Sequence, residues 1–314
     1  MSPKNPTPLE RRNATLELLF ASIIWGFGFV ATVWALKETS ALGFLFSRFA
    51  LAFLVGEVLR FVFFRKGRQF WNLLDFKLSI GAGLLMASFL LPQTVGLLFT
   101  SASNSGFLTI LYVVLVPILG WVFWGIRYPL PVYGLALVAF IGAFLMMGAQ
   151  FHGLNTGDIW TLVCALMAAV HILYVGKIAP RIQDSFRFNN YQSLWCLIAV
   201  VPLLPFDSQL SFIPTSMIPW LGLLSTAIGS SLIGFMIQIR AQKVLSDTTA
   251  SQLFLLESPF AMIFGYLILS EEVTPLKLGG AFLILLSSFL TLQLENGGGS
   301  TKSTKPELKR PQIP

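Results

Sequence analysis

Charged residues are scarce in this sequence of 314 residues, at 11% of the chain, while 55% of the residues are hydrophobic. Soluble domains carry about 25% charged residues, so the deficit excludes an ordinary soluble protein. The apolar runs leave only short connectors, and no separate soluble domain is expected. Cysteine is also rare: Cys164 and Cys196 both fall within apolar runs, so no disulfide framework is indicated.

Motifs that carry catalysis or bind nucleotides are absent as well. The sequence contains no HExxH, no P-loop, no GxSxG and no cluster of acid and base residues. Each of these patterns marks a common enzyme or nucleotide-binding class, and an ATP-driven pump would need the P-loop. We therefore expect no enzymatic activity, no metal and no cofactor, while coupling to protons stays open.

Long apolar runs are what the sequence does contain. A membrane-spanning helix needs about 20 mostly apolar residues, and ten segments come near this length. The predicted spans are 16–36, 42–64, 78–99, 104–124, 130–148, 157–179, 190–207, 217–240, 249–269 and 276–294. The first is a full span rather than a signal peptide. The expected fold class is an all-α integral membrane protein with ten transmembrane helices.

The net charge of +7 comes from the connectors and tails between and around these spans. With a cytoplasmic N-terminus, nearly all lysines and arginines fall on the cytoplasmic side, as the positive-inside rule requires. We therefore predict a multi-pass protein of a bacterial inner membrane, with cytoplasmic tails over 1–15 and 295–314, the second disordered. Its expected partners are the lipid bilayer and a small molecule, with no nucleic acid; a homodimer stays open.

The two halves of the chain align at a constant offset of 145 residues, without gaps, from about residue 79 to 143. In this register Gln93 matches Gln238 and Ser101 matches Ser246. Five spans per half make the second copy enter the membrane from the opposite side. We therefore predict two inverted five-helix repeats, over 16–148 and 157–294.

Several motifs resemble a known family. The segments TSASNSGFLTILYVVLVPILGWVFW (100–124) and AQKVLSDTTASQLFLLESPFAMIFGYLILSEEVTPLKLGGAFLIL (241–285) are similar to the two EamA-type repeats of the drug/metabolite transporter superfamily. WGFGFV (25–30) and GDIWTLVCAL (157–166) add to this resemblance. The resemblance implies ten helices in two inverted halves, a central cavity, and transport of small metabolites or drugs, often as export. One departure is Arg127, where the family commonly has an acidic residue.

The segment FLLESPFAMIFG (254–265) places a glutamate and a proline inside an apolar run. A lone carboxylate at mid-membrane costs about 3 kcal/mol even on insertion scales, so Glu257 should face the bundle. Pro259 cannot donate to the carbonyl of Leu255, which we expect to be left bare at a kink. Together they predict a carboxylate and a free carbonyl at a transport site. The alternative is that the family's Glu–Ser/Pro pattern is structural.

Six further side chains are candidates for the same site, each with a structural alternative. Tyr112 is the repeat counterpart of Glu257, and Trp25 is either a cavity wall or part of close packing beside Gly26. Arg48 either contacts substrate or ties neighbouring carbonyls together. The remaining candidates are Gln93, Gln238 and His171.

These last three differ in what they would contribute. Gln93 and Gln238 either line the cavity or join helices by hydrogen bonds. His171 either relays protons or is hydrogen-bonded to a neighbouring helix. Pro92, Pro117 and Pro259 are expected to break helices near the site.

The sequence thus favours a secondary-active transporter of small polar metabolites, such as amino acids, related compounds or drugs, acting as an exporter. One alternative is an anion exchanger for sugar phosphates or nucleotide sugars, but this would need several basic groups, and Arg48 alone lies within a span. A second alternative is a non-transporting membrane receptor or assembly subunit. A large cytoplasmic output domain would favour it, and none is predicted.

Overall fold

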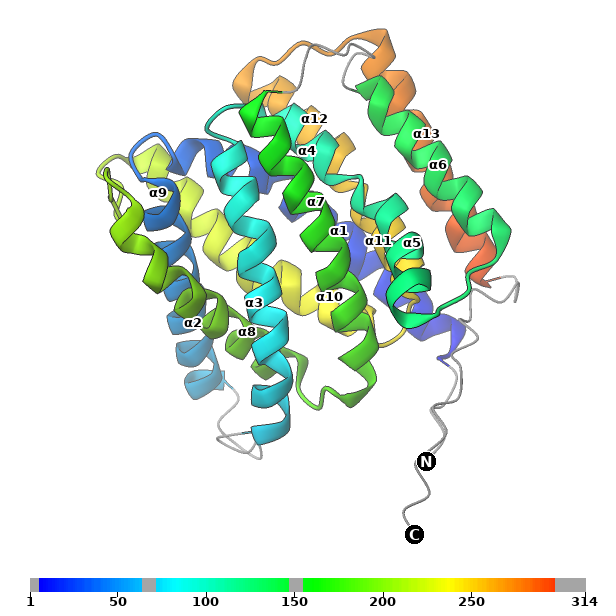
Figure 1. The fold of residues 1–314 in the computed structure, drawn as a ribbon, viewed down its shortest axis with the longest axis horizontal. Coiled ribbons are helices and arrows are strands. Elements are labelled where there is room, and N and C mark those ends of the chain that lie inside the picture. Colours follow the sequence, from blue (N-terminus) through cyan, green and yellow to red (C-terminus); the bar gives the residue numbers. More distant parts are fainter. Residues whose placement is uncertain (1–5, 64–71, 147–154, 297–314) are drawn as a thin grey trace.

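The computed structural model of the chain describes residues 6–63, 72–146 and 155–296. Over these ranges it is a helical bundle without strands (Figure 1). The helices of the first half are α1 (Pro8–Ala35), α2 (Ala41–Phe63), α3 (Leu73–Gly96), α4 (Ala102–Thr109), α5 (Tyr112–Trp124) and α6 (Leu130–Met146). Those of the second half are α7 (Thr156–Ile178), η1 (Ala179–Arg181), α8 (Ser185–Val200), η2 (Val201–Phe206), α9 (Met217–Leu224), η3 (Ser225–Gly234), α10 (Phe235–Ala241), α11 (Asp247–Phe254), α12 (Glu257–Leu269) and α13 (Pro275–Asn296).

Eight helical segments of the described residues are long and apolar enough to cross a membrane, with mean hydropathies of 1.6 to 2.3 over their best windows. The chain is therefore a multi-pass membrane protein. The two other predicted spans correspond to α6, an apolar helix of 17 residues, and to α8. The count of ten membrane crossings stays a prediction.

The seventh predicted span, 190–207, is shifted in the structure. The α-helix begins at Ser185, where the side chain of Asp184 accepts hydrogen bonds from Phe186 and Arg187, and it ends at Val200. The 3-10 segment η2 follows, with Pro202 at its start. The polar residues at the start of α8 hid the helix from a hydropathy criterion, because their side chains are buried inside the bundle rather than exposed to lipid.

The fourth and ninth predicted spans are each divided into two helices. α4 and α5 are separated by residues 110–111, and α11 and α12 by residues 255–256. All four pairs of bounds differ by the same 145 residues: 102 and 247, 109 and 254, 112 and 257, 124 and 269. Gly125 and Ser270, which follow α5 and α12, both have left-handed backbones. The two halves therefore share one local plan at these broken helices.

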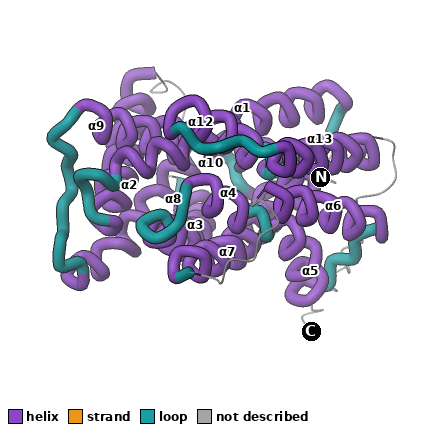
Figure 2. The backbone as a smooth tube through the Cα atoms, turned by 90° about the horizontal axis from the view of Figure 1, so that it is seen from above, coloured by secondary structure: helices purple, strands orange, loops and turns teal. Residues whose placement is uncertain are grey.

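Each half of one broken helix packs against the opposite half of the other broken helix. α4 packs against α12, and α5 packs against α11. α6 and α13 lie side by side at one edge, while α2, α8 and α9 lie towards the opposite edge (Figures 1 and 2). α3 packs against both α7 and α8, and α1 contacts α9, η3 and α12. This arrangement puts the broken helices near the middle of the molecule.

The two ends of the described chain meet on one side of the bundle. The guanidinium of Arg11, in the second turn of α1, lies 3.7 Å from the carboxylate of Glu295, at the end of α13. Glu295 also accepts hydrogen bonds from the backbone and hydroxyl of Ser246, the N-cap of α11. An even number of membrane crossings would produce this meeting of the two ends.

The prediction that three prolines break helices near the site is wrong. Pro92 and Pro117 lie inside α3 and α5, which continue past them. Pro259 is the third residue of α12, after the break, where the first-turn nitrogens have no intrahelical acceptor and a proline costs little. The carbonyl of Leu255 is not bare either, because it accepts a hydrogen bond of 3.0 Å from the Ser258 amide.

Candidate functional site

A cavity lies between the two halves of the chain, beside the breaks in α4–α5 and α11–α12. Its volume is about 90 Å³, and part of it is open to the surroundings. Its walls come from α1, α2, α3 and α7, from η3 and α10, and from both broken helices.

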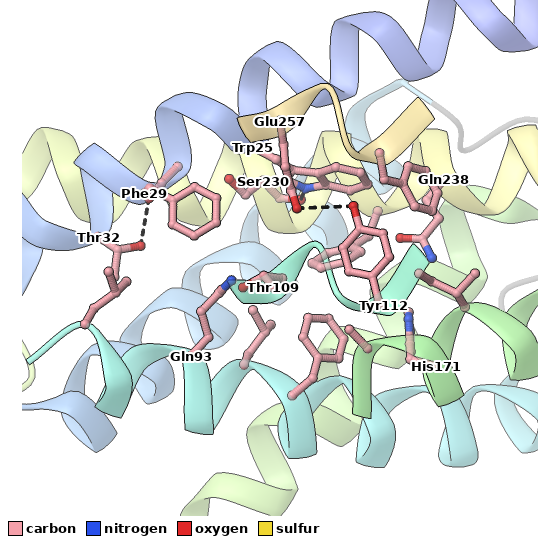
Figure 3. Close-up of a pocket in the computed structure, with 18 of the residues that line it drawn as sticks. Trp25, Phe29, Thr32, Gln93, Thr109, Tyr112, His171, Ser230, Gln238 and Glu257 are labelled. Carbon is pink, nitrogen blue, oxygen red and sulfur yellow. Dashed lines mark hydrogen bonds between the residues drawn. The ribbon is translucent and has the colours of Figure 1, made fainter. Parts of the chain in front are cut away.

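The structure brings the seven side chains that the sequence nominated to this one cavity. They are Trp25, Arg48, Gln93, Tyr112, His171, Gln238 and Glu257. Figure 3 shows Tyr112 and Glu257 pointing towards each other, with Gln93, His171 and Gln238 directed into the same space. The three nominated prolines do not line it.

Glu257 and Tyr112 meet at the centre of the site. Each is the first residue of a half-helix, α12 and α5, and each is buried. The phenol of Tyr112 donates a hydrogen bond of 3.3 Å to Oε1 of Glu257. The hydroxyl of Ser258 donates 3.0 Å to the carbonyl of Gly106 in α4, which ties α12 to the opposite broken helix. These bonds hold the carboxylate at the junction of the two halves.

Arg48 approaches the cavity from α2. Its side chain is buried at 4% exposure, and its Nε donates a hydrogen bond of 2.8 Å to the hydroxyl of Ser231 in η3. The guanidinium also lies 5.5 Å from the ring centre of Phe49. Serine is neutral, and among the residues that the structure describes none forms a salt bridge with Arg48.

The segment η3 is a π-helix, and three of its carbonyls accept hydrogen bonds from side chains of neighbouring helices. The amide of Asn189 donates to the carbonyls of Ser231 and Leu232, both at 3.0 Å. The indole of Trp25 lies 3.4 Å from the carbonyl of Ser230. π-Helical segments occur frequently at functional sites.

His171 is joined to this network rather than left free. One ring nitrogen lies 3.2 Å from the amide oxygen of Gln192, and the amide nitrogen of Gln192 lies 3.4 Å from the side-chain oxygen of Asn189. The His171 ring also packs on Phe89, with centres 5.2 Å apart. The interhelical hydrogen bond that was the structural alternative for His171 is therefore present, on a residue that also lines the cavity.

Both roles predicted for Trp25, a cavity wall and close helix packing beside Gly26, are found in the structure. It lines the cavity and packs on Phe254 and Phe235, with ring centres 5.3 and 5.5 Å away. Its neighbour Gly26 allows α1 to approach α12 closely, because a Cβ at this position would lie 2.6 Å from the Cβ of Phe260. The cavity wall thus depends on a close helix contact one residue away.

Hydrogen bonds join α10 to α7 and α11 next to Gln238, which lines the cavity. The amide of Gln238 donates 3.1 Å to Gln242, and Gln242 donates 2.9 Å to the carbonyl of Ile172 and 3.3 Å to Asp247. Gly176 of α7 lies directly against Asp247 and leaves no space for a side chain. Gln238, Gln242 and Asp247 thus form a polar cluster next to the cavity wall.

A small apolar cluster also reaches the cavity wall. Phe29, Leu97, Ala102 and Ala261 form a small buried cluster, and two of them, Phe29 and Leu97, line the cavity. At the offset of 145, Leu97 corresponds to Gln242 and Ala102 to Asp247. The apolar cluster and the polar cluster therefore share two pairs of equivalent positions in the two halves of the chain.

Sequence reasoning missed several lining residues. Ser230, Thr32 and Thr109 contribute hydroxyls, and Phe89 and Phe235 contribute aromatic walls. Single serines and threonines are common in membrane helices, and their pattern gives no signal of a π-helix. Tyr174 of α7 does not line the cavity, and its hydroxyl donates to the carbonyl of Leu78.

A multi-pass helical membrane protein with a cavity between its two halves, lined by polar and charged side chains, has the architecture of a transporter. The comparisons with known proteins agree. The chain belongs to the EamA-like transporter family, whose model matches it twice, over residues 14–148 and 155–293. Membership of a transporter family also supports a non-enzymatic role.

Individual proteins resemble the chain over most of its length. An uncharacterized transporter of Archaeoglobus fulgidus is 34% identical over 280 residues, which cover 89% of this chain and 85% of the archaeal protein. A protein of known crystal structure matches with a TM-score of 0.69 over 91% of this chain and 98% of its own length. Its sequence identity is 16%, so it supports the fold alone.

Proposed function

We propose that the protein is a secondary-active exporter of small polar metabolites in a bacterial inner membrane, with both termini in the cytoplasm. The observation that carries this proposal is the convergence of the nominated side chains on one cavity, with the Tyr112–Glu257 hydrogen bond joining the two halves there. The meeting of Arg11 and Glu295 supports termini on one side of the membrane.

The proposed transport cycle is alternating access between two inverted five-helix repeats. Matching bounds of the broken helices, and their crossed packing, support two copies of one unit. In such a pair the cavity opens to one side when the contacts at that end separate, while those at the other end stay closed. The polar cluster of Gln238, Gln242 and Asp247 would close one side, and the apolar cluster around Phe29 and Leu97 the other.

Glu257 is the group that we assign to energy coupling. A single carboxylate in a closed cavity can bind either a proton or a positively charged group of the substrate, but not both at once. Binding of the proton therefore excludes binding of the substrate, and the reverse. The site faces the cytoplasm to bind the substrate and returns from the outside with a proton on Glu257, so one proton enters for each substrate that leaves. An inward proton gradient then drives export.

Counterflow in proteoliposomes tests this function. Purified protein would be reconstituted and offered pooled libraries of small metabolites, with and without a pH gradient. We expect exchange of at least one pool without a gradient, and accumulation against its concentration when the gradient is imposed. Binding of solutes without any counterflow would instead support a non-transporting receptor.

A further inference from the structure

The first three spans of the two halves are exchanged in the bundle. α3, from the first half, packs against α7 and α8 of the second half. In the same way the segment α9–η3–α10, from the second half, packs against α1 and α2 of the first half. The result is two groups of three spans, each built from both halves. We call them the α2 group (α1, α2 and α9–η3–α10) and the α8 group (α7, α8 and α3).

A carboxylate fixes the connector of each group. Glu38, between α1 and α2, accepts a hydrogen bond of 2.9 Å from the amide of Ser216, the N-cap of α9. Asp75, in the first turn of α3, accepts one of 2.9 Å from the amide of Asp184, the N-cap of α8. Each bond joins residues of a single group, so the two groups can move against each other without breaking either bond.

Glu57 joins the two groups where α2 packs against α8. Its Oε1 accepts hydrogen bonds from Arg187 and, at 2.5 Å, from the amide of Asn190, both on α8. Its Oε2 accepts from Arg60, one turn further along α2, at 3.1 and 3.2 Å. Gly56 allows this approach, because a side chain there would collide with Asn190. Glu57, Arg187, Asn190 and Arg60 together form the Glu57 bridge.

Other residues of the α8 group hold Arg187 in place. Its guanidinium lies 4.5 Å from the ring centre of Tyr191, and that ring packs edge-on against Phe76 of α3, 5.1 Å away. The side chain of Arg187 is 6% exposed and that of Glu57 27%. Removing one partner of a buried ion pair is strongly destabilising, because it leaves the other charge uncompensated. The bridge therefore favours the arrangement in which α2 and α8 are in contact at this point.

The bridge lies between the cavity and the end of α2. Glu57 comes nine residues after Arg48, which lines the cavity, or about 14 Å further along the helix. On α8, Asn190 is next to Asn189, which belongs to the network that reaches His171 in the cavity wall. Because α2 is the second span, this end of it lies on the same side of the membrane as the N-terminus.

The opposite end of α2 has no comparable bridge. There α2 contacts η2, the segment that follows α8. The first seven residues of α2, ALGFLFS, and the six residues of η2, VPLLPF, include no ionisable side chain. The ionic contact between α2 and the segment α8–η2 is therefore confined to the side of the N-terminus.

Building on the proposed alternating access, we infer that the Glu57 bridge is a gate that closes the cavity on the side of the N-terminus. While the bridge is formed, α2 and α8 stay in contact at this end, and the two groups separate only at the other end. When the cavity opens to the side of the N-terminus, the bridge breaks. Because the bridge stabilises only one of the two states, its removal shifts the population towards the state that is open to this side. In the proposed orientation this is the cytoplasmic side.

Two reporter cysteines test this gate. Ser193→Cys lies one turn beyond Asn190 on α8, and the Ser193 hydroxyl has no hydrogen-bond partner among the residues that the structure describes, so the exchange breaks no bond. Thr32→Cys lies in the cavity wall, near the other end of α1. Each reporter would be introduced with Cys164 and Cys196 replaced by serine. An impermeant maleimide would label the first from the side of the N-terminus and the second from the opposite side, in vesicles of known orientation.

Glu57→Gln keeps the shape of the side chain and removes its charge. We expect about three-fold faster labelling of Ser193→Cys from the side of the N-terminus, and about three-fold slower labelling of Thr32→Cys from the other side. Arg187→Gln should produce the same two shifts. The double variant should not exceed the larger single effect, because both changes break one bridge.

Glu17→Gln is the matched control, because the ion pair of 2.8 Å between Glu17 and Arg240 joins α1 to α10 within the α2 group. It should change neither labelling rate. Size-exclusion chromatography checks the folding of every variant. If Glu57→Gln does not fold, Asn190→Ser, which removes one donor and keeps both ion pairs, should give smaller shifts in the same two directions.

Faster labelling of both reporters in the folded variants would show a general loosening of the bundle and would overturn the inference. Unchanged rates for both reporters would overturn it as well. Labelling needs no substrate, so this result is independent of the counterflow test, whose failure would contradict the transport function alone.

Discussion

Tyr112 donates a hydrogen bond of 3.3 Å to Glu257, and these two residues stand at equivalent positions in the two halves of the chain. Each opens a half-helix after a break, at the start of α5 and of α12. The two residues occupy equivalent positions in the two halves, but one side chain is a phenol and the other is a carboxylate. The proposed transport site is built around this asymmetry.

Replacing Tyr112 with phenylalanine tests the contribution of this bond. The ring and its packing remain, while the donor to Glu257 is lost. A hydrogen bond to a charged group contributes about 1.5–3 kcal/mol, so we expect the transport rate to decrease by about ten-fold. The measurement is initial-rate transport in proteoliposomes with equal amounts of reconstituted protein. An unchanged rate would show that the phenol has no part in the site.

Gly26→Ala tests the close contact that supports the cavity wall. A Cβ at Gly26 would lie 2.6 Å from the Cβ of Phe260 and 2.8 Å from the Glu257 carbonyl, so one helix must shift. Overpacking of this kind costs about 1–3 kcal/mol, and we expect a lower melting temperature in detergent.

Gly134→Ala is the matched control for Gly26→Ala. Its Cβ would have open space around it, so its melting temperature should stay the same or rise slightly, since alanine favours a helix more than glycine. Equal effects of the two substitutions would contradict close packing of α1 on α12.

Asp247→Ala tests the proposal that the polar cluster of Gln238, Gln242 and Asp247 closes one side of the cavity. Removing the carboxylate deletes the hydrogen bond from Gln242 and frees the space against Gly176. We expect at least three-fold faster labelling by an impermeant maleimide of a cysteine placed at Ala168, in a background with Cys164 and Cys196 replaced by serine. Lys243→Ala, at an exposed neighbouring position, is the control. Unchanged labelling would place the closure elsewhere.

Glu38 gives a prediction on pH. It lies in the connector between α1 and α2, and hydrogen bonds from Ser216 and Thr215 lower its pKa from 4.5 to about 2. Because the folded-state pKa lies below the ordinary value, these bonds contribute stability that is fully present above about pH 4.5 and is lost as the pH falls towards 2.

Glu38→Ala should therefore lower the melting temperature in detergent by about 1–3 °C at pH 7. The difference from the wild type should shrink as the pH falls below 4.5. Lys37→Ala, at an exposed neighbouring position, should show no such trend. A difference that stays constant down to pH 3 would contradict a role for the ionised carboxylate.

Much of the site could be predicted from the sequence because its charged residues are unusual within apolar, membrane-spanning segments. Glu257 and Arg48 are charges in apolar segments, and such charges must face the bundle interior. Tyr112 was found through the repeat register, which places it opposite Glu257. In each case a single residue carried the signal.

Other features depend on tertiary structure and could not be recognised in the sequence. The breaks at 110–111 and 255–256 fall within apolar sequences that favour a continuous helix, and the prolines near them misdirected the prediction. The π-helix η3, which supplies the partner of Arg48, has an ordinary sequence of small and aliphatic residues. The early start of α8 was missed because polar residues there face inward.

The central claim is that Glu257 couples transport to the proton gradient. The most direct test is to measure pH-gradient-driven transport by the Glu257→Gln variant. Glutamine keeps the shape of glutamate and can still accept the hydrogen bond from Tyr112, but it carries no charge and cannot exchange a proton. The variant should fold and insert, and it should show no pH-gradient-driven accumulation in proteoliposomes at any substrate concentration. Accumulation and pH dependence equal to those of the wild type would contradict the claim and reduce Glu257 to a structural residue.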